Sequence, residues 1–383
     1  MKRNSAPTAR TGKGAAALIA AATVGDGIFA LPYVFMKAGW FVSVAYLAAL
    51  GGFVVLAHSV YLATLEKEYE KRRLLGLARM YFGEGGFWTG FVAIVAGLLL
   101  TLVAYLLLGT QFIVLAFPGA PSAAAFALLW ALLAIPVFLD GRGARGLERA
   151  GIAVTSLAVA AIFAMALPAI LTRGALFIAA PFADWRNFFL PFGPVLFTLA
   201  GWTGIESVYE ARHEESPHAV GRTPWAALAR GTAFAALLYV LFAAGVLGSV
   251  PVVAPDTASG LAAWPVWERE LAAVMGLVAV ATVYIPIARE IRNALEKDLA
   301  WNKWVARAGI LLVPPALVGL GLTDFLAVVG IVGGVFLSVQ YLLIVAVGRR
   351  ALAPSPVKRF FLDLAAAVFV IAAVYEIVGF VVH

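Results

Sequence analysis

The strongest constraint on this sequence is a series of apolar runs, each long enough to cross a membrane, that recurs along the whole chain. The hydrocarbon core of a bilayer needs about 20 mostly apolar residues per helix. The runs therefore predict an all-α polytopic membrane protein with about eleven transmembrane helices. The expected spans are residues 14–36, 38–64, 88–117, 122–139, 149–172, 187–210, 224–248, 265–288, 304–321, 323–347 and 358–380.

Composition supports this interpretation and excludes other classes of protein. Hydrophobic residues make up 63% of the chain and charged residues 13%, whereas soluble domains average about 45–50% and 25%. A soluble enzyme, a disordered protein, a coiled coil and a nucleic-acid-binding domain are excluded on these grounds. The absence of cysteine excludes disulfides, thiol catalysis and thiolate metal sites, and only 4 histidines argue against a histidine-built metal centre. We expect no enzymatic activity, no cofactor and no nucleic-acid partner.

The basic residues predict the orientation of the helices. Counting along the predicted spans, 24 of the 28 Lys and Arg residues fall on the side of the N-terminus and 4 on the other. Cytoplasmic loops carry the excess of Lys and Arg. We therefore expect a multi-pass protein of the plasma membrane with a cytoplasmic N-terminus and an extracytoplasmic C-terminus.

Two of the predicted helices contain an interruption near their middle. The first reads Gly25-Asp26-Gly27 with Pro32 behind it, and the sixth reads Ala200-Gly201-Trp202-Thr203-Gly204 with Glu206 close behind. A charge between two glycines costs at least ~2.5–3.5 kcal/mol at the bilayer centre, so it needs a functional reason. The alternative is that the glycines are close-packing contacts between helices.

The spacing of the interruptions predicts an internal repeat. Gly25 and Gly201 are 176 residues and five helices apart, and an odd number of helices per repeat makes the two copies inverted. Interrupted helices at matching positions of inverted repeats indicate a transporter's binding site, whose free backbone N–H and C=O groups suit a zwitterion. We expect one transmembrane domain over residues 1–383, with repeats at about 14–172 and 187–347 and an additional helix at 358–380.

The run from Gly25 to Tyr33, followed by Lys37-Ala38-Gly39-Trp40, resembles the first helix of amino acid permeases of the amino acid–polyamine–organocation superfamily. The similarity is to the amino acid/auxin permease and the hydroxy/aromatic amino acid permease types, and Leu199 to Glu206 looks like their sixth helix. It implies the five-plus-five inverted-repeat fold of the bacterial leucine transporter. It also implies substrate contacts from Thr23, Val24, Gly25, Asp26, Gly27, Ile28, Ala200, Gly201, Trp202, Thr203 and Gly204.

The sequence departs from these families at Asp26, where they usually carry a small or neutral residue. Asp26 has three open interpretations: it exchanges a coupling proton, it pairs with the substrate's ammonium group, or it is neutral and caps the helix break. Glu206 is the second candidate for proton coupling. The alternative for Glu206 is an acid that faces water at the cytoplasmic end of its helix.

Sodium is the competing coupling ion. A hard cation needs several oxygen ligands, and Thr282 is the only Ser or Thr within 265–288. This favours a proton-coupled amino acid symporter that works by alternating access in the lipid bilayer. The alternatives are a sodium-coupled amino acid, amine or polyamine transporter, a non-transporting nutrient sensor, and a metal-ion transporter of the same fold. A metal-ion transporter would need soft or amide ligands on helix 6, which residues 200–204 do not contain.

Overall fold

The computed structural model describes residues 8–68, 73–138, 156–157, 159–164, 166–168, 170–171, 180–215, 225–250 and 252–382. Over these ranges the secondary structure is helical, as predicted. The α-helices are α1 (Thr8–Thr23), α2 (Leu31–Ala38), α3 (Trp40–Glu68), α4 (Leu74–Ala116), α5 (Ser122–Phe138), α8 (Phe192–Leu199), α9 (Thr203–Glu215), α10 (Trp225–Ser249), α11 (Val266–Asn293), α12 (Lys303–Gly319), α13 (Phe325–Ile331), α14 (Ser338–Leu352) and α15 (Pro356–Val382). The shorter turns are 3-10 helices η1 (Asp26–Ala30), η2 (Trp185–Asn187) and η3 (Ala258–Ala263), and π-helices η4 (Ala294–Asp298) and η5 (Val332–Leu337).

Both predicted helix interruptions are present. The first predicted span divides into α1 and the pair η1–α2, and the chain leaves the helical path at Val24 and Gly25, where Gly25 is extended with φ −144° and ψ −170°. The sixth divides into α8 and α9, with Ala200 in an extended conformation at the end of α8. The fold class is therefore confirmed as a helical membrane bundle with helices 1 and 6 broken.

The other predicted spans outside 149–172 each coincide with a helix or a joined helix pair. Most of 149–172 lies outside the described residues, so the count of eleven stays a prediction. Within the described ranges, six helices are long and apolar enough to cross a membrane: Trp40–Glu68, Leu74–Ala116, Trp225–Ser249, Val266–Glu296, Phe325–Leu352 and Pro356–Gly379.

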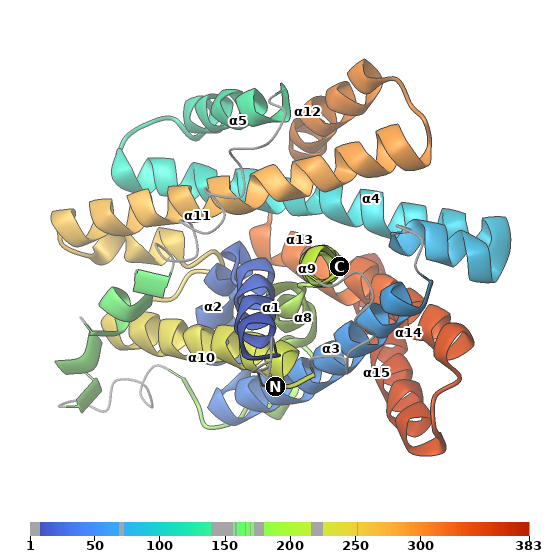
Figure 1. Ribbon diagram of the computed structural model, residues 1–383. Coiled ribbons are helices and arrows are strands. Elements are labelled where there is room, and N and C mark those ends of the chain that lie inside the picture. Colours follow the sequence, from blue (N-terminus) through green and yellow to red (C-terminus); the bar gives the residue numbers. More distant parts are fainter. Residues whose placement is uncertain are drawn as a thin grey trace, which may run out of the picture.

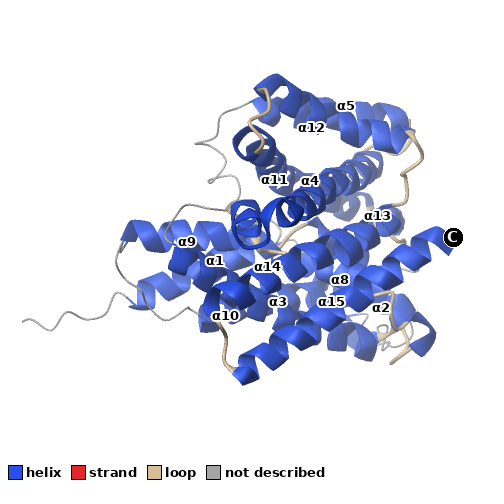
Figure 2. Ribbon diagram, turned by 90° about the vertical axis from the view of Figure 1, so that its right-hand side faces the viewer, coloured by secondary structure: helices blue, strands red, loops and turns tan. Residues whose placement is uncertain are grey.

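The interrupted helices lie at the centre of the bundle. α1 packs against α10 and α9, and α8 packs against η5 (Figure 1). α3 and α10 flank them on one side, and α4 and α11 cross on the other. α5 and α12 pack on the outside of α4 and α11, which both views show (Figures 1 and 2). This arrangement surrounds both helix breaks with protein.

Two helix starts are defined by local features. α4 begins at Leu74, with Leu74, Leu75 and Leu77 buried and a kink at Gly83 (φ 65°). Asp324 is the N-cap of α13, where its carboxylate accepts a hydrogen bond from the Ala327 amide at 3.0 Å.

Candidate functional site

A cavity of about 80 Å³ lies where the two interrupted helices face each other. Its wall comes from both helix breaks and from α4, α11 and η5. The lining residues are Ala22, Thr23, Gly25, Gly27, Leu98, Thr101, Tyr105, Phe197, Thr198, Ala200, Trp202, Thr203, Val283, Ile287 and Leu337.

Six of the eleven predicted contact residues line this cavity: Thr23, Gly25, Gly27, Ala200, Trp202 and Thr203. Val24, Ile28, Gly201 and Gly204 are not part of this lining. Val24 is buried beside the cavity, and Ile28 lines a separate apolar cavity of about 20 Å³ between η1, α10 and α11. The backbone of Asp26 begins η1, but its side chain is outside the described part of the chain.

Gly201 and Gly204 bring the two broken helices close together. A Cβ atom on Gly201 would lie 2.6 Å from Thr23 Oγ1, and one on Gly204 would overlap the Cβ of Ala22. These two glycines are therefore close-packing contacts between helices, as the alternative interpretation holds, and they also lie at the helix 6 break. Without side chains at these positions, α9 can lie directly against α1.

Tyr239 of α10 links the two broken helices through one atom. Its side chain is fully buried, and its hydroxyl lies 2.6 Å from the carbonyl oxygen of Thr23 and 2.6 Å from that of Thr198. Thr23 ends α1 and Thr198 is next to last in α8. Carbonyls in the last turn of a helix lack intrahelical donors. Tyr239 was not among the site residues predicted from the sequence. The signal that could have found it is a phenol within an otherwise apolar span.

A second link holds the helix 6 break to the rest of the bundle. The indole N–H of Trp202 donates to Gln340 Oε1 at 2.7 Å, and Gln340 Nε2 donates to the Ala93 carbonyl at 2.9 Å. Both side chains are buried. This chain of hydrogen bonds connects the break to α14 and α4, and it fixes the face that Trp202 turns to the cavity.

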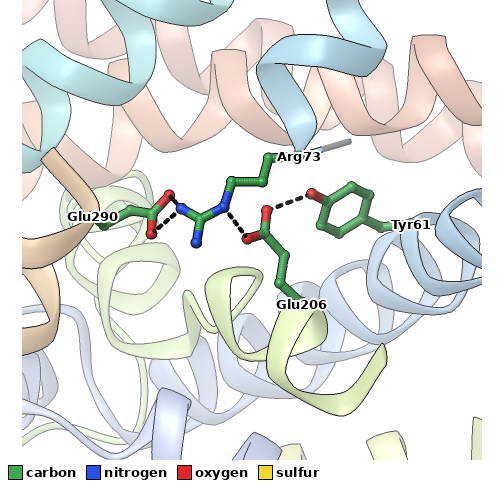
Figure 3. A network of polar contacts seen from close by, with 4 residues as sticks. All are labelled: Tyr61, Arg73, Glu206 and Glu290. Atoms are coloured by element: carbon green, nitrogen blue, oxygen red, sulfur yellow. Dashed lines mark hydrogen bonds and ion pairs between the residues drawn. The ribbon is translucent and has the colours of Figure 1, made fainter. Parts of the chain in front are cut away.

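A cluster of charged side chains surrounds Glu206, which lies one helical turn beyond Trp202 on α9. Figure 3 shows the Arg73 guanidinium between the carboxylates of Glu206 and Glu290, with Tyr61 on the far side of Glu206. Arg73 Nη1 lies 2.8 Å from both oxygens of Glu290, and Arg73 Nε lies 3.4 Å from Glu206 Oε2. The Tyr61 hydroxyl donates to Glu206 Oε1 at 2.7 Å. Glu206 is thus not an acid that simply faces water, because only 14% of its side chain is exposed.

This cluster joins elements that lie far apart in the sequence. Tyr61 is on α3, Arg73 precedes α4, Glu206 is in the first turn of α9 and Glu290 is on α11. A further ion pair, Arg212 Nε to Glu66 Oε1 at 2.9 Å, ties the same α9 to α3. α9 is therefore attached directly to α3 and to Arg73 at the start of α4, and through Arg73 to α11. Sequence reasoning found Glu206 but not its partners.

Thr282, the possible sodium contact in the alternative with sodium coupling, is engaged within its own helix. Thr282 is buried, and its hydroxyl donates to the Ala279 carbonyl at 2.8 Å. Among the described residues, no group of three or more His, Cys, Asp or Glu side chains is placed to hold a metal ion.

Comparison with known proteins places this architecture in a family. The sequence profile of the tryptophan/tyrosine permease family matches residues 10–258, which is more than half of the chain. The chain belongs to this family. The match includes both helix breaks and Tyr239. A search of curated protein sequences gives no match.

Solved structures share the fold at low sequence identity. The crystal structure of MhsT in complex with L-phenylalanine is 13% identical, with a TM-score of 0.70 over 94% of this chain and 98% of that one. A manganese transporter from Eremococcus coleocola (mutant H236A) is 12% identical, with a TM-score of 0.69 over 99% and 90%. At these identities the likeness establishes the fold alone. Family and fold together make this permease a multi-pass membrane transporter rather than an enzyme, which agrees with the expected class of protein.

Proposed function

We propose that this permease moves aromatic amino acids across the membrane by alternating access and is coupled to protons. The observation that carries the proposal is the cavity between the two broken helices, with backbone ends on one side and apolar and aromatic side chains on the other. The family and the L-phenylalanine complex of MhsT support an aromatic substrate.

The chemistry of the cavity suits a zwitterion with a ring. The N-terminal ends of η1 and α9 offer N–H groups to a carboxylate, and the C-terminal ends of α1 and α8 offer carbonyl oxygens to an ammonium group. Phe197, Trp202 and Tyr105 supply aromatic surface. The volume of about 80 Å³ is below the ~300–1,000 Å³ of most ligand pockets, so binding requires the lining helices to separate, as alternating access does.

The coupling proton is assigned to the cluster around Glu206. Its two carboxylates share the single guanidinium of Arg73, so these three groups carry one excess negative charge when all are ionised. Intramembrane carboxylates are common proton relays. A proton on Glu206 would release Arg73 toward Glu290 and loosen α9, which is the half of helix 6 nearest the predicted cytoplasmic side.

Asp26 keeps its three interpretations: proton exchange, pairing with the substrate's ammonium group, or capping of the break. Asp26→Asn separates them. Full pH-driven uptake by this variant excludes proton exchange, and a selective loss of substrate affinity supports the ammonium pair.

We further propose the topology expected from the positive charges, with the N-terminus cytoplasmic and the C-terminus outside. One domain over 1–383 would then contain the two inverted repeats and the additional helix α15. A C-terminal reporter that is active only in the cytoplasm would contradict this topology.

The deciding experiment is uptake into proteoliposomes. Radiolabelled tryptophan, tyrosine, phenylalanine, aliphatic amino acids and polyamines are tested under an imposed pH gradient or an imposed sodium gradient. We expect accumulation of aromatic amino acids under the pH gradient alone. Glu206→Gln should abolish that accumulation while leaving exchange of labelled for unlabelled substrate measurable. Uptake that requires sodium would refute proton coupling, and uptake of manganese but no amino acid would refute the substrate class.

A further inference from the structure

The Tyr239 hydroxyl lies within hydrogen-bonding distance of two acceptors but has only one proton to donate. A phenol carries one proton, yet the carbonyl oxygens of Thr23 and Thr198 both lie 2.6 Å from it. The two carbonyls belong to the C-terminal ends of α1 and α8, where the helix dipoles place partial negative charge. Three oxygens therefore meet at one buried point with a single proton between them.

A point of this kind is where a cation would bind. Broken helices in transporters present carbonyl ends to coupling cations, and hard cations bind oxygens at about 2.3–2.6 Å. The side chain of Thr23 carries one further oxygen, since Thr23 Oγ1 is buried and has no hydrogen-bond partner in the described part of the protein. The Tyr239 hydroxyl oxygen occupies the place between the two carbonyls.

We propose that the Tyr239 hydroxyl takes the position of a monovalent coupling cation and thereby sets the ion specificity of this permease. The inference rests on the proposed function, since it explains how the broken helices are joined without sodium. The hydroxyl joins α1 to α8 as a neutral donor and leaves no space for an ion. Tyr239 is a positioning residue here, because it acts through the carbonyls of Thr23 and Thr198.

Replacement of Tyr239 by Phe tests this directly. The variant loses the donor and leaves two buried carbonyls facing a small space, which is unfavourable unless water or a cation enters. We expect sodium-free uptake to fall by roughly tenfold or more and sodium to restore part of it. The purified variant should melt about 2 °C or more higher in sodium chloride than in choline chloride of equal concentration, whereas the wild type should show no difference.

Tyr239→Ser provides a second variant with more space for an ion, so a folding defect of one variant does not end the test. Tyr284→Phe is the matched control, because Tyr284 is also buried, in α11, and its hydroxyl makes no hydrogen bond within the described ranges. It should melt identically in both salts.

The outcomes separate this inference from the proposed function. If neither Tyr239 variant gains sodium-dependent melting or uptake, the inference is wrong even when the wild type accumulates substrate with protons. Sodium-dependent melting of the wild type would also overturn it. If the wild type accumulates nothing under a pH gradient, proton coupling fails, while the melting of the variants still decides whether Tyr239 holds the place of a cation.

Discussion

The two helix breaks face the same cavity but use glycine in different ways. In the helix 1 break, Gly25 and Gly27 both line the cavity. In the helix 6 break, Gly201 and Gly204 face α1, where an added Cβ would meet Thr23 or Ala22. Gly25 therefore leaves space at the cavity, whereas Gly201 and Gly204 permit close contact with α1.

The breaks also differ in how their conformation is held. The helix 6 break is fixed by the hydrogen bond from Trp202 to Gln340, a side-chain link to the surrounding bundle. In the helix 1 break, the Val24 and Ile28 amides donate to the preceding carbonyls of Ala20 and Gly25. The Tyr239 hydroxyl contacts the end of α1 and equally the end of α8, so it is shared by both breaks. Since α9 combines close glycine contacts with ion pairs, we expect the helix 6 break to be the less tolerant of change.

The largest effect is expected for Gly204→Ala. The new Cβ would overlap the Cβ of Ala22, and neither atom can rotate away, so α1 and α9 must move apart. Overpacking of this kind costs about 1–3 kcal/mol. We expect the upper end of that range in denaturation of the purified protein, with loss of most uptake. Gly201→Ala is the control, because its Cβ would meet the Thr23 hydroxyl, which can rotate. A larger defect in Gly201→Ala would contradict the close contact with Ala22 as the constraint.

A smaller effect is expected for Trp202→Phe. The variant leaves Gln340 Oε1 without its buried donor, which costs about 1–3 kcal/mol. The ring that replaces the indole is no longer held in one orientation toward the cavity by a hydrogen bond. Trp130→Phe is matched to it, since the Trp130 indole donates to the Leu311 carbonyl at 2.9 Å between α5 and α12. Both variants should lose stability, but only Trp202→Phe should change the KM for an aromatic amino acid. Equal KM changes in both would refute a special role for the Gln340 link.

The sequence predicted the breaks but not what joins them. Glycines beside an acid in an apolar span indicate a helix break, and because a break is a local feature, the local rules for helices were enough to place it. The link from Tyr239 to Thr23 crosses 216 residues, and the pair Arg73–Glu290 crosses 217. Such contacts depend on how each helix is rotated in the bundle, which the pattern of a nearly uniformly apolar helix leaves undetermined.

The smallest effects compare the two glycines of the helix 1 break. A Cβ on Gly27 would lie 2.6 Å from Phe197 Cδ1 and 2.7 Å from Thr198 Cγ2, whereas a Cβ on Gly25 would meet only ordinary contacts, the nearest being Val283 at 3.7 Å. The Phe197 ring and the Thr198 methyl can shift slightly, so Gly27→Ala should cost about 1 kcal/mol. Gly25→Ala should stay within about 0.5 kcal/mol of the wild type. Denaturation of both purified variants, with uptake assays beside it, measures the difference. Equal stability loss in the two variants would mean that the cavity wall is equally tight on both sides of Asp26, and the glycines of this break would then serve close packing as those of helix 6 do.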